Sequence, residues 1–231
     1  MPRHLYRYFS DPKHADDFAD GLLLFKTLAY YRDYEDNGVR GDKNEGTSIY
    51  RPSGGLVVNN QTKGTTFTLD GSAFEASARA QEIFVYCLSK SFNDFLWNEF
   101  EAKACVEISC TATFCRRISL ALPEGASCPG PAHRQRLGHH VEYYNPAEVG
   151  GARWALPDKI ATAKSRDYSV QDEFRLAFGL NNAFAFEHAN YRIADDSAEK
   201  VADPSQHHSH FLRAQSLRDI CRIHTRPRSA T

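Results

Sequence analysis

The chain has 231 residues, of which 42% are hydrophobic and 25% are charged, within the range of ordinary globular proteins. Its formal net charge of -1 predicts no overall attraction to nucleic acid or to membranes. Because a chain of this length can bury one sizeable core, we expect a single domain over residues 1–231. The sequence contains no apolar run of signal-peptide or membrane-spanning length, so we expect a cytoplasmic protein without a membrane partner.

The first half of the chain alternates predicted strands with short polar segments. Apolar density and alternation predict strands at residues 4–9, 22–28, 54–60 and 65–69, the last two as a hairpin. Between the first two strands, Ser10 or Asp11 can cap a short helix that Gly21 ends. The stretch 30–46 is polar, contains glycine and is typical of a loop.

The second half continues with strands and one long irregular segment. Strands are predicted at residues 81–91, 103–110, 140–144, 170–178 and 182–193, and residues 217–224 predict either a last strand or a short helix. The Pro/Gly-rich segment near 123–138 predicts a long loop, and the Arg- and His-rich residues 207–231 predict a basic C-terminal tail. The whole pattern indicates an α+β protein with mixed, largely antiparallel sheets and short flanking helices.

Residues 164–178, KSRDYSVQDEFRLAF, place an unusual amount of charge in a strand-like run. On an extended chain, Gln171, Glu173 and Arg175 share one face, and Asp172 lies on the other. The shared face is either solvated or the floor of a polar cleft.

The sequence contains none of the familiar motifs for phosphate loops, dinucleotide folds, serine hydrolases or zinc peptidases, and we assign no metal site. The six cysteines form no C-x-x-C pair and are expected to be reduced thiols. What remains is a set of polar and aromatic residues on predicted strands and in the loop 30–46. These candidate residues are Arg7, Tyr30, Tyr31, Asp42, Glu45, Ser89, Gln171 and Glu173.

In chain order, the segments LYRYFS, RGDKNEG, VYCLSKSFNDFLWNEF and K…Y..QDEFRL resemble a large family of uncharacterised bacterial proteins. Members of that family open with a Lys/Arg-Tyr strand, continue with a Cys-x-Ser strand and a Trp turn, and close with a Lys…Glu-x-Glu-x-Arg strand. The resemblance covers residues 4–178, and Gln171 stands where the family has its first Glu. The family implies no activity.

The same elements also resemble ADP-ribosyltransferases of the Arg–Ser–Glu class. Arg7 in the first strand, Ser89 at the end of a middle strand, and Gln171 with Glu173 in a late strand follow the order of that class. The resemblance implies an ADP-ribosyltransferase-like fold and an enzyme that uses NAD as substrate. Such an enzyme transfers ADP-ribose to a macromolecular acceptor, protein or nucleic acid, and acts as a toxin or as an effector in antiviral defence or phage conflict, with a neutralising or complex partner.

Cleavage of the bond between nicotinamide and ribose builds positive charge on the sugar, as in glycoside hydrolysis. A carboxylate that faces this charge stabilises the transition state more than the ground state, and Glu173 is assigned this catalytic role. Gln171, on the same face, is suited to holding the acceptor.

The remaining candidates would bind the substrate. The fork of the Arg7 guanidinium matches the oxygens of a diphosphate. Ser89 would support Glu173 or contact the ribose, and Tyr30 or Tyr31 would stack on the nicotinamide ring. If Arg7, Ser89 and Glu173 act together, they must line one cleft.

Each of these residues also has a purely structural interpretation. The polar face around Glu173 is then the solvated side of an edge strand, and Arg7 pairs with a surface carboxylate. In the same view Ser89 caps the following turn, and Tyr30 and Tyr31 are core or rim aromatics.

Two other functions stay open. A metal-dependent nuclease or phosphodiesterase would use Asp42, Glu45 and Glu173 together with His139 or His140. A non-catalytic interaction protein would need none of these polar residues.

Overall fold

The computed structural model describes residues 2–33, 42–149, 151, 156–195 and 203–226. Its strands are β1 (Leu5–Phe9), β2 (Leu22–Thr27), β3 (Thr47–Tyr50), β4 (Leu56–Asn60), β5 (Thr65–Leu69), β6 (Ser72–Ser77), β7 (Ile83–Ser89), β8 (Ala104–Ile108), β9 (Gly138–His140), β10 (Glu142–Tyr144), β11 (Ala163–Ser165), β12 (Glu173–Gly179), β13 (Asn190–Asp195), β14 (Ser209–Arg213) and β15 (Cys221–Thr225). Its α-helices are α1 (Pro12–Ala19), α2 (Leu28–Arg32), α3 (Asp94–Glu99), α4 (Thr111–Ser119) and α5 (Pro157–Ala161). Short 3₁₀ helices are η1 (Ala132–Arg134), η3 (Arg166–Gln171), η4 (Phe186–His188) and η5 (Pro204–Gln206).

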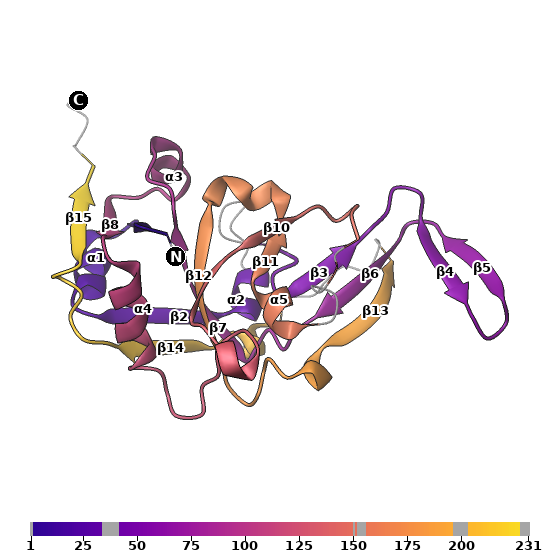
Figure 1. The fold of residues 1–231 in the computed structure, drawn as a ribbon. Coiled ribbons are helices and arrows are strands. Elements are labelled where there is room, and N and C mark those ends of the chain that lie inside the picture. Colours follow the sequence, from indigo (N-terminus) through magenta and orange to yellow (C-terminus); the bar gives the residue numbers. More distant parts are fainter. Residues whose placement is uncertain (1, 34–41, 150, 152–155, 196–202, 227–231) are drawn as a thin grey trace.

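The largest sheet has eight strands, in the order β14-β2-β7-β1-β8-β15, with β12 beside β7 and β9 beside β12. Every strand pair in this sheet is antiparallel. The smaller sheets are β13-β6-β3, the hairpin β4-β5 and the parallel pair β10-β11. The prediction of a mixed fold with largely antiparallel sheets and few, short helices is confirmed (Figure 1).

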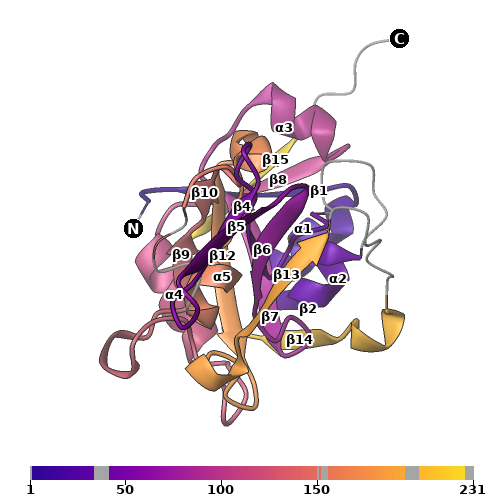
Figure 2. The same cartoon turned by 90° about the vertical axis from the view of Figure 1, so that its right-hand side faces the viewer.

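Most of the predicted elements are present. The five runs predicted for the centre of the fold are β1, β2, β7, β8 and β12, and all belong to the eight-stranded sheet. The predicted hairpin is β4-β5, which projects from the body of the molecule (Figures 1 and 2). The segment 123–138 is a loop that contains only the short helix η1.

The first helix begins and ends where the sequence indicates. Asp11 caps α1 by accepting a hydrogen bond from the Lys13 amide at 2.9 Å, and Pro12 occupies the first turn. Gly21 then reverses the chain with φ of +89°, and a Cβ there would lie 2.6 Å from the Ala214 carbonyl oxygen. Only glycine satisfies both conditions without strain.

The main sheet buries both of its faces. Alternate residues of β7 point to a large cluster of Phe, Leu and Ile side chains that α1 and α4 cover, where Tyr86 meets Phe18. The other β7 residues, such as Val85, face a smaller alanine-rich cluster beside α2 and α5. Because β12 lies between β7 and β9, all seven of its residues are buried.

Three predictions need correction. The helix α4 was not predicted, because its apolar positions are few and Cys110 at its start provides no side-chain cap. Of the predicted strand 182–193, only the end belongs to β13, since η4 precedes it. The basic segment 207–231 is not a tail over its described part, because β14 and β15 are edge strands of the main sheet.

These edge strands have a polar sequence because only some of their residues face the core. In β14 only Leu212 is buried, and β15 has no fully buried residue. Charged side chains on edge strands also discourage pairing with other chains.

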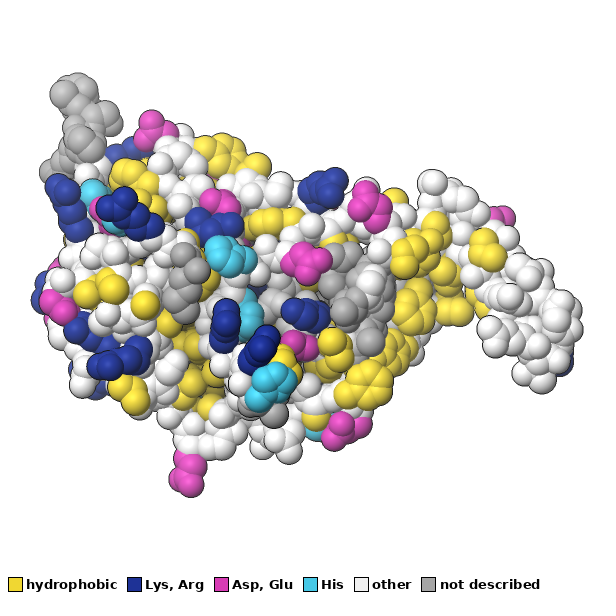
Figure 3. Space-filling model, in the orientation of Figure 1, with side chains coloured by type: hydrophobic (Ala, Val, Ile, Leu, Met, Phe, Trp, Pro, Cys, Tyr) yellow, Lys and Arg dark blue, Asp and Glu magenta, His cyan; other side chains and the backbone are white. Residues whose placement is uncertain are grey.

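Among the described residues, no helix is long and apolar enough to span a membrane. On the face shown in Figure 3, Lys and Arg side chains are scattered over the body among those of Asp and Glu. The projecting hairpin shows few charges of either sign (Figure 3).

Gly138 is required where β9 pairs with β12, because the space beside it is filled by other side chains. A Cβ on Gly138 would lie 2.7 Å from Cζ of Phe174 and 3.1 Å from Sγ of Cys115, both buried in the core. We therefore expect Gly138→Ala to lower the free energy of unfolding by ~1–3 kcal/mol, measured by urea denaturation.

Gly54→Ala is the matched control, because no atom lies within 4 Å of a Cβ built there. Its effect should stay within ~0.5 kcal/mol of wild type. Equal stability of the two variants would show that the close contact at Gly138 relaxes at no cost.

Candidate functional site

The site begins at a split in the main sheet. One edge of β7 pairs with β12 along the whole strand, whereas the other edge is shared by two strands. Phe84 and Val85 pair with β2, and Ser89 pairs with β1. Between them the edge of β7 has no strand partner, and the Cys87 carbonyl accepts a hydrogen bond from Nη1 of Arg7 instead. The two strands thus diverge around Cys87.

A cavity of about 430 Å³ opens over this split. Pockets of this size are typical of small-molecule and cofactor sites. Tyr6, Tyr8 and Phe100 contribute aromatic side chains to its lining, and Leu22, Leu24 and Phe211 contribute apolar ones. The six residues assigned from the sequence all line this cavity: Arg7, Tyr30, Tyr31, Ser89, Gln171 and Glu173.

Gln171 and Glu173 face the cavity for a reason other than the one predicted. The run 170–178 is not a single strand, because Gln171 ends η3 and β12 begins only at Glu173. Asp172 joins them in the left-handed conformation, with φ of 44° and ψ of 50°. This turn brings both neighbouring side chains to the Lys164 ammonium.

Asp172 points away from the cavity, as predicted. Its carboxylate pairs with Nζ of Lys90 at 2.7 Å and accepts a hydrogen bond from Oγ of Ser91 at 2.6 Å. These contacts hold a left-handed residue that is not glycine.

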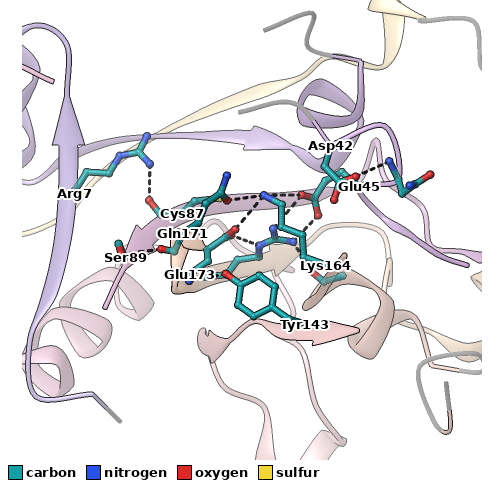
Figure 4. A network of polar contacts seen from close by, with 12 residues as sticks. Arg7, Asp42, Glu45, Cys87, Ser89, Tyr143, Lys164, Gln171 and Glu173 are labelled. Carbon is teal, nitrogen blue, oxygen red and sulfur yellow. Dashed lines mark hydrogen bonds and ion pairs between the residues drawn. The ribbon is translucent and has the colours of Figure 1, made fainter. Parts of the chain in front are cut away.

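The Glu173 carboxylate is held at both oxygens (Figure 4). Its Oε1 accepts a hydrogen bond from Nε of Arg175 at 2.8 Å, and its Oε2 lies 3.3 Å from Nζ of Lys164. Lys164 also donates to Oε1 of Gln171 at 2.9 Å. Lys164 lines the cavity and Arg175 does not. The carboxylate is therefore held from behind by Arg175, while Lys164 reaches it from the cavity side.

Arg175 is the most deeply buried charged residue of the site, with 0% of its surface exposed. Its Nη1 and Nη2 lie 2.7 and 3.1 Å from the two carboxylate oxygens of Glu45. Nη1 also donates to the Ala161 carbonyl at 2.7 Å. The interpretation of this face as the solvated side of an edge strand is therefore wrong.

The charges of this network fix its protonation. Burial alone would raise the pKa of Glu173, but Arg175 and Lys164 outweigh it and hold that pKa well below its usual range. Burial would lower the pKa of Lys164, but Glu173 and Glu45 raise it above its usual value. Glu173 is thus an anion at neutral pH and is unsuited to be a general acid.

Cys87 lies beside this carboxylate and remains a thiol. Burial, followed by the charge of Glu173, raises its pKa to about 12. The thiolate needed for nucleophilic attack is therefore scarce at neutral pH.

Arg7 reaches the cavity from the opposite face of the sheet. Tyr6 pairs with Ser89, and Ser89 pairs with Glu173, so these three residues share a face and Arg7 starts from the other. Its guanidinium lies 4.7 Å from the centre of the Tyr86 ring and donates to the Cys87 carbonyl at the split. All the assigned residues line one cavity only because the sheet is open at this point.

The Arg7 guanidinium carries an uncompensated charge. Among the described residues it forms no ion pair, and its buried Nε has no hydrogen-bond partner. The predicted pairing with a surface carboxylate is absent from the described part of the chain. A cation in this state at the floor of a cavity favours an anionic ligand.

Ser89 supports the neighbouring chain. Its hydroxyl donates to the Gln171 carbonyl at 2.8 Å and accepts from the Ser91 amide at 3.0 Å. It therefore braces Gln171 and caps the turn that follows β7. The expected contact of Ser89 with the Glu173 side chain is not made.

Tyr30 and Tyr31 lie on α2 rather than in a loop. Thr27 caps this helix by accepting a hydrogen bond from the Tyr30 amide at 3.3 Å. The two rings meet edge to face, with centroids 5.4 Å apart, and burial raises the pKa of the Tyr31 hydroxyl. Within the predicted loop 30–46, residues 34–41 lie outside the described residues.

Four further residues complete the site: Lys164, Arg175 and Tyr143, for which the sequence indicated no role, and Glu45, for which it indicated only a metal site. The Tyr143 hydroxyl accepts a hydrogen bond from the Glu173 amide at 2.8 Å. Two of the four had a visible signal, because Lys164 and Arg175 match the Lys…Arg positions of the family resemblance. In addition, Arg175 stands among apolar residues, where a charge needs a partner.

The arrangement expected for a metal-dependent nuclease is not formed. Among the described residues, no group of three or more His, Cys, Asp or Glu side chains is placed to hold a metal ion. Glu45 and Glu173 pair with cations instead, and neither His139 nor His140 lines the cavity.

Comparisons of the chain with protein-family models, with curated proteins and with solved structures found no match. The chemistry of the site is therefore the basis for proposing a function. That chemistry consists of an ionised carboxylate and an amide on one wall, an uncompensated guanidinium at the floor, and aromatic rings around them.

Replacing Arg175 with Met should destabilise the protein strongly. The substitution leaves the Glu45 and Glu173 carboxylates buried without their main partner. We expect the free energy of unfolding to fall by ~3–5 kcal/mol in urea denaturation. Arg79→Met, which breaks a partly exposed pair with Glu82, should cost no more than ~1 kcal/mol. Similar losses for the two variants would contradict a structural role for the buried network.

Asp42 should make stability depend on pH. Burial, followed by the charge of Glu45, raises its pKa to about 6, above the ~3.9 of an unfolded Asp. The native state therefore binds the proton more tightly, and this contribution is present below pH ~4 and lost as pH rises through about 6.

Asp42→Asn removes this effect and can keep the hydrogen bond from the Asn44 amide. We expect the variant to be more stable than wild type by ~3 kcal/mol at pH 7.5 and nearly equal to it at pH 4. Urea denaturation at the two pH values measures the difference. A stability difference between variant and wild type that does not change with pH would mean that folding leaves the pKa of Asp42 unchanged.

Proposed function

We propose that this chain is an ADP-ribosyltransferase-like enzyme that cleaves NAD and transfers ADP-ribose to a macromolecular acceptor. One observation carries the proposal: Arg7, Gln171 and Glu173, from distant parts of the chain, line one aromatic cavity. The order of these residues along the chain and the mixed, mostly antiparallel fold agree with the resemblance to the Arg–Ser–Glu class. A role as a toxin or as an effector in phage conflict belongs to the same proposal.

The reaction breaks the bond between C1′ of the ribose and the nicotinamide nitrogen. The bonding electrons leave with nicotinamide, so positive charge develops on the ribose ring. Glu173 is ionised at neutral pH and opposes that charge, while Arg175 fixes its position from behind. The nucleophile of the acceptor then bonds to C1′ and loses its proton.

Lys164 aligns the two acceptor groups of the site. It joins Oε2 of Glu173 to Oε1 of Gln171, so both acceptor groups are already aligned. A ribose hydroxyl can donate to the remaining lone pairs of the carboxylate. The amide group of Gln171 has both a donor and acceptors, which suits it to orient the incoming acceptor.

The other cavity residues bind the rest of the dinucleotide. Arg7 offers the fork of donors that matches diphosphate oxygens. The Tyr31 ring provides an aromatic surface for the nicotinamide or the base. Ser89 acts on the site through the backbone of Gln171 rather than by touching the substrate.

Incubation with NAD labelled in its adenylate half tests the activity directly. Release of nicotinamide reports cleavage, and transfer is followed by adding a bacterial lysate. Label that protease removes identifies a protein acceptor, whereas label that nuclease removes identifies a nucleic acid. Absence of both cleavage and NAD binding would contradict the proposal.

Glu173→Gln should reduce the rate of NAD cleavage by ~10²–10³-fold per folded molecule, because it removes the charge that opposes the developing cation. Because Glu173 forms buried ion pairs with Lys164 and Arg175, this variant also loses stability. Circular dichroism and NAD-induced thermal stabilisation, at a temperature where the variant is folded, separate lost chemistry from lost structure.

The neighbours of Glu173 provide the comparison. Gln171→Ala should impair transfer to the acceptor more than hydrolysis of NAD, because water needs no positioning by the amide. Asp172→Asn should affect neither, since its side chain points to Lys90 and Ser91. Wild-type cleavage by Glu173→Gln would remove the case for an enzyme of this class.

A further inference from the structure

A second cation of the cavity has no carboxylate partner. Lys26, on β2, lines the cavity, and its Nζ lies 4.7 Å from the centre of the Tyr30 ring. Among the described residues it forms no ion pair, in contrast to Lys164, which has two buried carboxylates beside it. A cation on an aromatic face keeps its N–H donors available for a ligand.

Lys26 and Arg7 stand on opposite sides of the split. Lys26 pairs with Val85 of β7, whereas Arg7 donates to the carbonyl of Cys87, two residues further along. Two residues of a strand span about 7 Å. The two side chains therefore reach the gap from positions about two residues apart along β7, and both line the same cavity.

We propose that Arg7 and Lys26 together form a diphosphate-binding site, in which Lys26 selects ligands that carry two adjacent phosphoryl groups. A single phosphoryl group is satisfied by the fork of Arg7. The second phosphoryl group adds negative charge that Arg7 alone cannot neutralise, and the ammonium of Lys26, on its long stem, reaches it as a point charge. The inference rests on the proposed function only in taking NAD as one such ligand.

The carboxylates of the cavity support the same division of roles. Glu45 and Glu173 are both neutralised by Arg175 and Lys164, and the third carboxylate of the lining, Asp17 on α1, is only partly buried. The cationic side of the cavity is thus the split itself. A ligand would place its diphosphate there and direct its ribose toward Glu173.

Binding measurements with small probes test this site without requiring catalysis. Isothermal titration of the full chain would compare pyrophosphate with phosphate, and ADP with AMP. For wild type we expect pyrophosphate and ADP to bind at least ~10-fold more tightly than phosphate and AMP, because a charge-assisted hydrogen bond contributes ~1.5–3 kcal/mol.

Lys26→Gln should raise the Kd of pyrophosphate and of ADP by ~10-fold or more. It should change the Kd of phosphate and of AMP by less than ~3-fold. Lys26→Arg should restore most of the preference, because it keeps the charge. Lys63→Gln, in the turn of the hairpin β4-β5, is the matched control for loss of a lysine and should change nothing.

The proposal would be overturned if Lys26→Gln weakened the binding of AMP and of ADP equally. It would also be overturned if the wild-type protein did not bind the diphosphate ligands more tightly. The outcome is separable from that of the proposed function. Selective binding of ADP without cleavage of NAD would support the diphosphate site and reject the transferase. If instead the protein cleaves NAD and Lys26→Gln changes neither the rate nor the KM, the transferase would be supported and the diphosphate site rejected.

Discussion

A fully buried guanidinium holds the candidate site together. Arg175 joins Glu173, at the start of β12, to Glu45, which precedes β3, and to the Ala161 carbonyl at the end of α5. Because a charge in a protein interior is tolerated only when its donors are satisfied, these three segments can lie in few other ways around it. The position of Glu173 at the cavity wall follows from that constraint.

The split between β1 and β2 is the second determinant. A continuous sheet would have covered the edge of β7 at Cys87 and left no room for a ligand. Here Arg7 occupies the place of the missing strand hydrogen bond, and its charge becomes part of the cavity floor. The same opening lets residues from both faces of the sheet contribute to one site, which strand alternation alone does not allow.

The site combines a neutralised wall with a cationic floor. At the wall, Lys164 and Arg175 balance the charges of Glu45 and Glu173, so an ionised carboxylate persists in a buried position. At the floor, the charges of Arg7 and Lys26 are available to a ligand. This asymmetry orients an anionic ligand that carries a sugar, and it links the proposed reaction to the proposed diphosphate site.

The sequence alone indicates the central strands β1, β2, β7, β8 and β12, their largely antiparallel class, and six residues that line the cavity, because alternation and apolar density are local properties of the chain. It identified Gln171, Asp172 and Glu173 but assigned them to a regular strand, since nothing local distinguishes a left-handed Asp172 from an extended one. Two features are visible only in the folded chain: the pairing of Arg175 with Glu45, 130 residues away, and the divergence of β1 and β2 along one edge of β7. Both depend on which segments meet in space, and pairing between distant segments is set by the packing of the whole core rather than by the residues near each partner.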